Sequence, residues 1–238
     1  MKKVVASAIL SVSLLLSMAP ASFASEVSSV TFSNQDFEKL SSHLNDLGLS
    51  EKVQQSLIEK IKAGELPDSD NPEKKDTGIT SEVESSDGMK IQKTTFPDGS
   101  VIQSTIDLTN AKIKEEHVIT PNDVSGGYAS GGTGYRTFTN ATVREETSFV
   151  KARFFADYTL VQGGYSYISD AYDPYIDIIG GYSSGENLVV DQPKQTDSRP
   201  ARATLTFTWV KINGYFSSTY KLFLYVHNSS ASSQLQTY

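Results

Sequence analysis

Residues 201–227 read ARATLTFTWVKINGYFSSTYKLFLYVH, and the alternation within this stretch decides the fold. Leu205, Phe207 and Trp209 alternate with threonines, and this period of two predicts a strand with one buried and one solvated face. Residues 213–214 are Asn-Gly, the strongest short signal for a hairpin turn, so strands over 201–212 and 217–227 should pair. Apolar residues on both faces of the second strand are typical of a central strand.

The β pattern continues toward the N-terminus, in short segments rich in Tyr, Phe, Thr, Val and Ile. These segments predict further strands over residues 135–143, 148–161, 165–172 and 175–179. Gly, Pro and Asp between them supply the turns, as at Asp173-Pro174. Six to eight strands in about 100 residues predict an antiparallel β-sandwich over residues 135–238. The chain as a whole is expected to be mainly β, with a short helical hairpin and a small β-hairpin region before the sandwich.

Two short amphipathic helices are predicted ahead of the strands. Apolar residues recur every three or four positions over residues 37–47 and again over residues 53–61. Small polar residues can cap each helix at its start, and a glycine can end each one in a left-handed turn. These cap and stop residues are Ser33 or Asn34, Gly48, Ser50 and Gly64. Such short helices bury little alone, so they should pack on each other, on the strands or on a partner.

A polar segment and a hairpin follow the helices. Residues 65–80 contain two prolines, five acidic residues and few apolar ones, which indicates a linker or an irregular loop. Residues 89–96 and 101–108 should then pair as a hairpin around the turn Pro97-Asp98-Gly99. Asp87 and Asp98 are interpreted as turn formers.

Composition divides the chain near residue 125. All 12 tyrosines and the single tryptophan lie between Tyr128 and Tyr238, as do all five arginines. Residues 25–124 carry 10 Lys against 19 Asp and Glu, whereas residues 125–238 carry nine basic and nine acidic residues. We therefore predict an acidic region over 25–124, a Gly-rich linker over 125–134 and a Tyr-rich domain over 135–238. A processing site in the Gly-rich segment, with the acidic region as a pro-region, is the alternative.

The N-terminus predicts export. Lys2 and Lys3 precede an apolar run over residues 4–18, and Ser22-Phe23-Ala24 offers a cleavage site after Ala24. The alternative is a membrane anchor, but the run is shorter than the roughly 20 residues that span a bilayer. The chain has no cysteine, so its fold depends on packing and hydrogen bonds. We expect a secreted, extracellular, disulfide-free protein of a Gram-positive bacterium, without a transmembrane segment in the mature chain.

Residues 45–105 resemble a known module. The stretch LGLSEKVQQSLIEKIKAGELPDS at 47–69 and the stretch TFPDGSV at 95–101 are similar to an N-terminal module of secreted Gram-positive proteins. Some relatives of that module are grouped with large geobacillin-type bacteriocins. The resemblance implies export, a two-part layout and an antimicrobial activity. Its motifs are helix caps and turns, so it implies no catalytic residues.

No catalytic constellation is evident. The histidines His43, His117 and His227 are interpreted as structural or solvent-facing, and the GxSxG and HExxH motifs are missing from the sequence. Glu145 and Glu146 should point to opposite faces of a strand and are interpreted as solvated turn residues. A basic footprint for nucleic acid is also lacking. We therefore expect a protein that is not an enzyme, with a secreted hydrolase that uses two carboxylates as the second alternative.

Metal and cofactor sites are not predicted. Loop aspartates can hold calcium, and Asp170, Asp173 and Asp177 are weak candidates, but the order of an EF-hand loop is missing. Turn formation is the simpler role for these carboxylates. We expect no cofactor.

Tyrosines are the best candidates for binding. A tyrosine ring gives a broad amphipathic contact at a small entropy cost. The candidate surface consists of Tyr165, Tyr167, Tyr172, Tyr175 and Tyr182. We expect a binding or effector protein that acts at the cell envelope on an envelope component, a polysaccharide or another protein. The alternative is a bacteriocin-like protein acting on competing bacteria.

Overall fold

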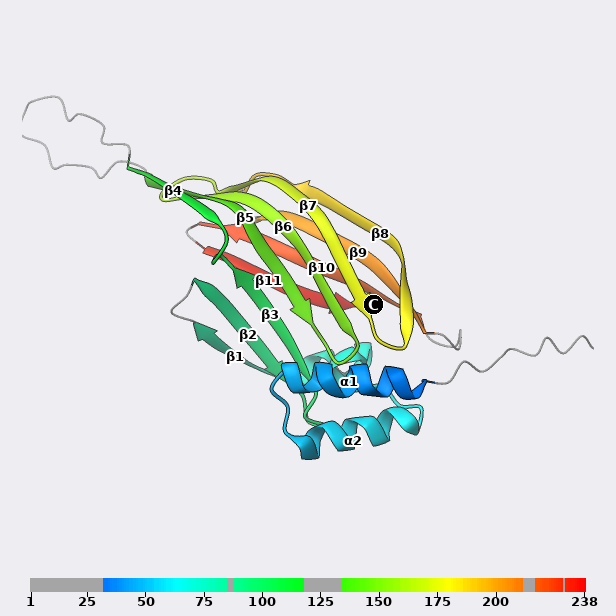
Figure 1. Ribbon diagram of the computed structural model, residues 1–238. Helices are drawn as coiled ribbons and strands as arrows, with labels where there is room; N and C mark the ends of the chain where they lie inside the picture. The colour runs from blue at the N-terminus through cyan, green and yellow to red at the C-terminus, as the bar shows by residue number, and fades with distance from the viewer. Residues whose placement is uncertain (1–31, 85–87, 118–133, 212–216, 229) are drawn as a thin grey trace, which may run out of the picture.

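The computed structural model describes residues 32–84, 88–117, 134–211, 217–228 and 230–238. The described chain folds as two antiparallel β-sheets with two short helices at one end (Figure 1). The mainly β fold and the preceding helical region are therefore as predicted.

The first sheet has seven strands. Its order is β1-β2-β3-β5-β6-β7. β4 also pairs with β5, along the same edge of β5 as β3, and β6 pairs along the opposite edge. The strands are β1 (Ile79–Glu84), β2 (Met89–Thr95), β3 (Val101–Asp107), β4 (Lys112–His117), β5 (Gly134–Glu146), β6 (Val150–Val161) and β7 (Tyr167–Ile178). The pairing of β2 with β3 confirms the predicted hairpin.

The second sheet has four strands in the order β11-β10-β9-β8. They are β8 (Gly181–Gln192), β9 (Ala201–Lys211), β10 (Ser217–His227) and β11 (Ser230–Thr237). The predicted pairing of the strands on either side of Asn213-Gly214 is confirmed, whereas the turn itself lies outside the described residues. β10 is a central strand, as its two apolar faces predicted.

The core lies between the sheets. Leu205, Phe207 and Trp209 of β9 are fully buried, which confirms the alternation seen in the sequence. Tyr220 of β10 stacks on Phe207, with ring centroids 5.4 Å apart. One hydrophobic cluster extends from the helices through both sheets.

The composition step near residue 125 falls inside this architecture. β3, from the acidic region, pairs with β5, from the Tyr-rich region, over residues 103–107 and 142–146. The predicted Gly-rich linker at 125–134 lies outside the described residues except for Gly134. On either side of it, the acidic and Tyr-rich regions share one sheet and one hydrophobic core.

The two helices close one end of the sandwich. α1 (Asn34–Asp46) begins at Ser33, whose hydroxyl accepts from the Asp36 amide at 3.1 Å, and α2 (Glu51–Lys62) begins after Ser50. Gly48 and Gly64 adopt positive φ at the helix ends, as predicted. His43 is buried on α1, where its Nε2 lies 2.7 Å from the Thr147 carbonyl, so its role is structural.

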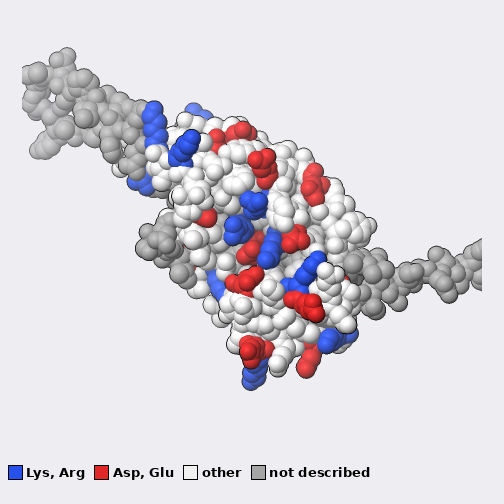
Figure 2. Space-filling model, viewed as in Figure 1, with Lys and Arg blue, Asp and Glu red and all other residues white. Residues whose placement is uncertain are grey.

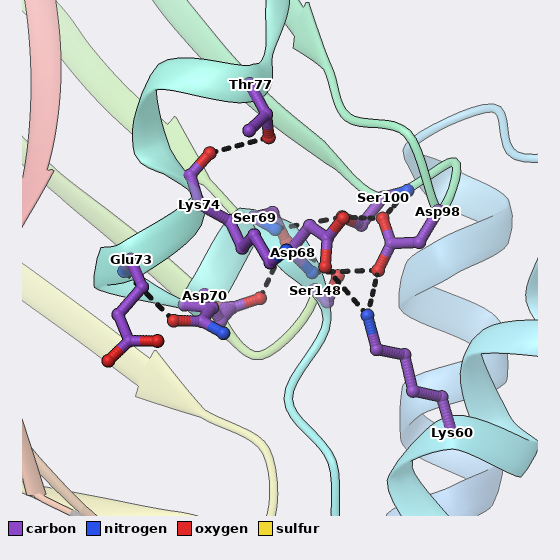
Figure 3. A network of polar contacts seen from close by, with 11 residues as sticks. Lys60, Asp68, Ser69, Asp70, Glu73, Lys74, Thr77, Asp98, Ser100 and Ser148 are labelled. Atoms are coloured by element: carbon purple, nitrogen blue, oxygen red, sulfur yellow. Dashed lines mark hydrogen bonds and ion pairs between the residues drawn. The ribbon is translucent and has the colours of Figure 1, made fainter.

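The prediction of a linker or irregular loop over residues 65–80 is wrong in part. Residues 65–80 contain two short 3-10 helices, η1 (Asp68–Asp70) and η2 (Pro72–Thr77), and η1 is buried. Figure 3 shows how polar side chains hold this segment: the Lys60 ammonium lies 2.8 Å from both the Asp68 and Asp98 carboxylates. The Asp98 carboxylate also accepts from the Ser100 amide, so it forms the predicted turn and in addition binds α2. Composition alone does not predict that such a polar segment is buried, because its polar groups are buried by pairing with each other.

Four strands were not predicted, namely β1, β4, β8 and β11, and one predicted break was wrong. β8 and β11 are the edge strands of the second sheet, and their polar sequences lack a clear alternation. Asp173-Pro174 does not end a strand: β7 runs through it as one strand with a register shift, and Asp173 takes a φ of 50°. Proline is tolerated there because β7 is at the edge of its sheet.

Candidate binding surface

Three of the five candidate tyrosines lie on one face. Tyr167, Tyr172 and Tyr175 belong to β7, and their partners on β6 are Thr159, Phe155 and Arg153. The intervening β6 residues Ala152, Phe154, Ala156 and Tyr158 are buried in the core. Because neighbouring side chains alternate, the three tyrosines lie on the outer face of the first sheet. They lie along the strand and not in turns.

The other two candidate tyrosines lie apart from this face. Tyr182 is 58% exposed and pairs with Val210 in the second sheet, on the side opposite the buried Trp209. Tyr165 precedes β7 and borders a hollow of about 680 Å³ at the end of β6. Its hydroxyl donates to Asp197 Oδ1 at 2.6 Å, and His227 is exposed in the same hollow. The five rings therefore do not form one surface.

Arg153 is held between two aromatic rings on the outer face of the first sheet. Its guanidinium carbon lies 5.1 Å from the centroid of Tyr175 and 5.3 Å from that of Phe155. Phe155 in turn stacks with Tyr172, with centroids 6.0 Å apart. A guanidinium over an aromatic face is attracted by the ring quadrupole and loses side-chain freedom. We call Arg144, Arg153, Phe155, Tyr172 and Tyr175 the Arg153 platform.

One end of the platform is fixed by hydrogen bonds. The Tyr172 hydroxyl donates to Asp157 Oδ1 at 3.2 Å and to Asn140 Oδ1 at 3.3 Å. Asp157 Oδ1 also accepts from the Asn140 amide at 2.8 Å, where β5 bulges and Asn140 takes a φ of 65°. Burial and the Asp157 carboxylate raise the pKa of the Tyr172 hydroxyl, so this ring stays neutral and remains a donor at physiological pH.

The other end of the platform is cationic. Arg144 lies directly opposite Arg153 in the pairing of β5 with β6. Together with Glu146, Lys151, Ala152 and Tyr175, the two arginines line a shallow hollow of about 140 Å³. Within the described part of the chain, neither arginine forms an ion pair with a carboxylate. Like charges directly opposite each other on adjacent strands are unfavourable, so this pair lacks the counter-charge that a ligand can supply.

Acidic side chains surround this cationic centre. Figure 2 shows basic side chains gathered over the middle of the face, with acidic side chains between and around them. Glu146, Lys151 and Asp177 form the neighbouring row across β5, β6 and β7. A bound ligand must therefore be recognised by short-range contacts, because the face has no extended field of one sign.

The sequence did not single out Arg153 and Phe155. Residues 151–158 read KARFFADY, and their alternation places Lys151, Arg153, Phe155 and Asp157 on one face. That signal was present, but only the pairing of β6 with β7 shows that the tyrosines lie beside these residues.

The weak calcium candidates do not form a site. Asp170, Asp173 and Asp177 are exposed on β7, and the Asp170 carboxylate accepts from the neighbouring Ala171 amide at 2.8 Å. No three acidic or histidine side chains in the described ranges are arranged to hold a metal ion. The expectation that these aspartates form turns was also wrong, since β7 runs through them.

Glu145 departs most from its prediction. It points away from Glu146, as expected, but it is fully buried between the sheets and is not a solvated turn residue. Ser104 Oγ donates to its Oε2 at 2.5 Å, and the Ser233 hydroxyl lies beside the carboxyl. Burial raises the pKa of Glu145 to about 7. A glutamate at the end of a strand looks solvated in sequence, because the second sheet that covers it comes from residues far along the chain.

Comparison with known protein families, with curated proteins and with solved structures finds no match for this chain. No helix within the described residues is long and apolar enough to cross a membrane.

Proposed function

We propose that this protein is a secreted, non-enzymatic binding protein that acts at the cell envelope through the Arg153 platform. The observation that carries the proposal is the placement of Arg153 beside Phe155 and Tyr175, with Arg144 opposite, which has no ion pair within the described residues. Export rests on the leader-like residues 1–24.

The platform is best suited to an anionic ligand. A guanidinium that packs against aromatic rings keeps N–H donors at its edges, where a carboxylate or phosphate can accept two hydrogen bonds at once. Its orientation is already set by the rings, so little further side-chain freedom is lost on binding. Tyr175 is 50% exposed and adds a ring on which a sugar can pack.

The shape of the platform favours a polymer. Its hollow of about 140 Å³ is too small to enclose a typical small-molecule ligand. The rest of the face is the outer surface of a sheet with bulges in β5 and β7, along which an extended chain can contact several rows of side chains. We therefore propose an envelope polymer with regularly spaced carboxylate or phosphate groups as the ligand.

The test is binding of the purified protein to three immobilised polymers: polygalacturonate, poly(glycerol phosphate) and neutral dextran. We expect retention on at least one anionic polymer and none on dextran. Raising the salt from 50 to 500 mM should weaken the binding several-fold, because the guanidinium contacts are partly exposed. Retention on all three polymers, or on none while the protein is folded by circular dichroism, would contradict the proposal.

A further inference from the structure

A second surface follows the edge of β11. A groove of about 660 Å³ runs between this strand and the first sheet. Its far wall carries hydroxyl and amide side chains of β1, β2 and β3, namely Thr80, Gln92, Thr94 and Ser104. Charged and apolar residues line the same side, namely Lys75, Asp76, Glu82, Phe96 and Ile102. The groove exists because the first sheet extends through β3, β2 and β1, whereas the second sheet ends at β11.

The groove follows the strand edge. Seven consecutive residues of the chain, 232–238, line it. Successive side chains of a strand point to opposite faces, so consecutive residues border one groove only where the groove runs along the backbone. β11 pairs with β10 alone in the described sheets, so its other edge presents unpaired N–H and C=O groups to the groove.

This edge lacks the usual protection against strand addition. Natural edge strands carry charges, prolines or bulges that prevent another strand from pairing. β11 reads SASSQLQT, without a charge or a proline, and its pairing with β10 keeps one register from Ser230 to Thr237. β7, one of the two edge strands of the first sheet, differs: it carries Asp170, Asp173, Pro174 and Asp177 and has two register shifts.

An incomplete polar site lies beneath the groove. Ser104 and Ser233 line the groove and also contact the buried carboxyl of Glu145. Glu145 Oε1 has no hydrogen-bond partner within the described residues, although it is buried. A small hollow of about 20 Å³, lined in part by Ser104, Ser232 and Ser233, lies at the same place. A buried polar atom without a partner is costly, so a group that enters from the groove would be stabilising there.

We propose that this groove binds an extended peptide segment, which adds to β11 as a further strand. Alternating backbone N–H and C=O groups of the segment match the free edge, and small or amide side chains match the hydroxyl and amide groups of the far wall. The occupant is a single segment, because the groove is bounded on one side by β11 and on the other by β1, β2 and β3. This site is separate from the Arg153 platform and does not depend on it.

The test begins with selection of peptides from a displayed library of random nonapeptides on the purified full chain. We expect selected peptides that bind more tightly than about 1 mM. N-methylation at alternate residues should weaken binding at least tenfold, because it removes the N–H donors on one edge of the peptide.

Variants locate the site. The double substitution Ser232→Lys/Gln234→Lys places charges on exposed positions of β11, as natural edges do, and should weaken peptide binding at least tenfold. The matched control is Val189→Lys on β8, the other edge of the same sheet, which should change binding less than twofold. Thermal melting checks that both variants remain folded.

Four results would overturn the proposal, and three of them come from the peptide experiments. These three are the failure of the library to yield a binder, equal binding of the N-methylated peptides, and equal binding by the double lysine variant. A wild-type dimer that the double lysine substitution dissociates would also overturn it, because a second copy would then occupy the edge. Loss of polymer binding by the Arg153 platform would leave the peptide result unchanged, so the two proposals fail separately.

Discussion

Asp70 and Glu145 are both fully buried carboxyls, but they lie at different borders of the sandwich. Asp70 is on η1 near the end that the helices close. It accepts hydrogen bonds from the Thr147, Ser69 and Tyr220 hydroxyls and from the Ser148 amide. Glu145 is beneath the open groove along β11, and its Oε1 has no partner in the described chain.

This difference separates a structural acid from an incomplete site. The donors around Asp70 come from η1, from the turn between β5 and β6, and from β10, so its carboxyl joins three parts of the fold. In the described chain, the hydroxyl groups beside the Glu145 carboxyl are those of Ser104 and Ser233, and both residues also line the groove. Desolvation raises the pKa of Asp70 to about 6 and of Glu145 to about 7. We expect substitution of Asp70 to lower the free energy of unfolding. Substitution of Glu145 by a neutral residue should raise it at a pH where the buried carboxyl is ionised.

The largest expected effect is that of Asp70→Ala. The substitution leaves several buried donors without an acceptor, so the free energy of unfolding should fall by about 3 kcal/mol. Urea denaturation measures this change. The matched control is Glu73→Ala on η2, an exposed carboxyl of the same segment, which should change stability by less than about 0.5 kcal/mol. Equal effects of the two variants would show that Asp70 is not a structural centre.

A smaller effect of opposite sign is expected for Glu145→Gln. The pKa of Glu145 is raised in the folded chain, so the folded state binds the carboxyl proton more tightly than the unfolded state does. Its stabilising contribution is present below pH 4.5 and is lost as the pH rises through about 7. Glutamine stays neutral, so at pH 8 the variant should be more stable than wild type by about 2 kcal/mol.

Two pH values decide this prediction. At pH 5 the Glu145 carboxyl is mostly protonated in the folded state and partly ionised in the unfolded state, so the variant should differ from wild type by less than about 1 kcal/mol. Urea denaturation at pH 5 and pH 8 measures the difference. A variant that is destabilised equally at both values would mean that Glu145 is fully paired, and the contrast with Asp70 would disappear.

The smallest effect is expected for Ser233→Ala. The Ser233 hydroxyl stabilises the ionised form of Glu145, so its removal should raise the pKa of that carboxyl further. Stability at pH 5 should change by less than about 1 kcal/mol, because the carboxyl is then neutral. Carbon-detected NMR titration of the glutamate side chains measures the pKa. A downward shift would show that Ser233 does not donate to Glu145.

Local patterns predicted much of the fold. The alternation of Leu205, Phe207 and Trp209 placed β9 with its buried face correctly, and the caps of α1 and α2 follow from Ser33, Gly48 and Gly64. These features depend on a few neighbouring residues, which the sequence displays directly. β8 and β11 were missed because edge strands bury little and need no strong apolar alternation.

The candidate site was predictable only in part. The tyrosine count pointed to β7, and Tyr172 and Tyr175 do lie in one platform. Tyr182 was grouped with them because it is near in sequence, but the chain passes to the second sheet at β8. Arg144 reaches Arg153 only through the register of β5 with β6. Such placements depend on long-range pairing, which composition and spacing do not encode.

The most direct test of the platform is the affinity of matched variants for the anionic polymer that wild type retains. Arg153→Ala removes the stacked guanidinium, whereas Tyr182→Ala removes an exposed ring from the other sheet. Isothermal titration calorimetry should show at least a tenfold loss for Arg153→Ala, equivalent to about 1.4 kcal/mol, and less than a twofold change for Tyr182→Ala. Equal affinity of Arg153→Ala and wild type, with both proteins folded, would contradict the account.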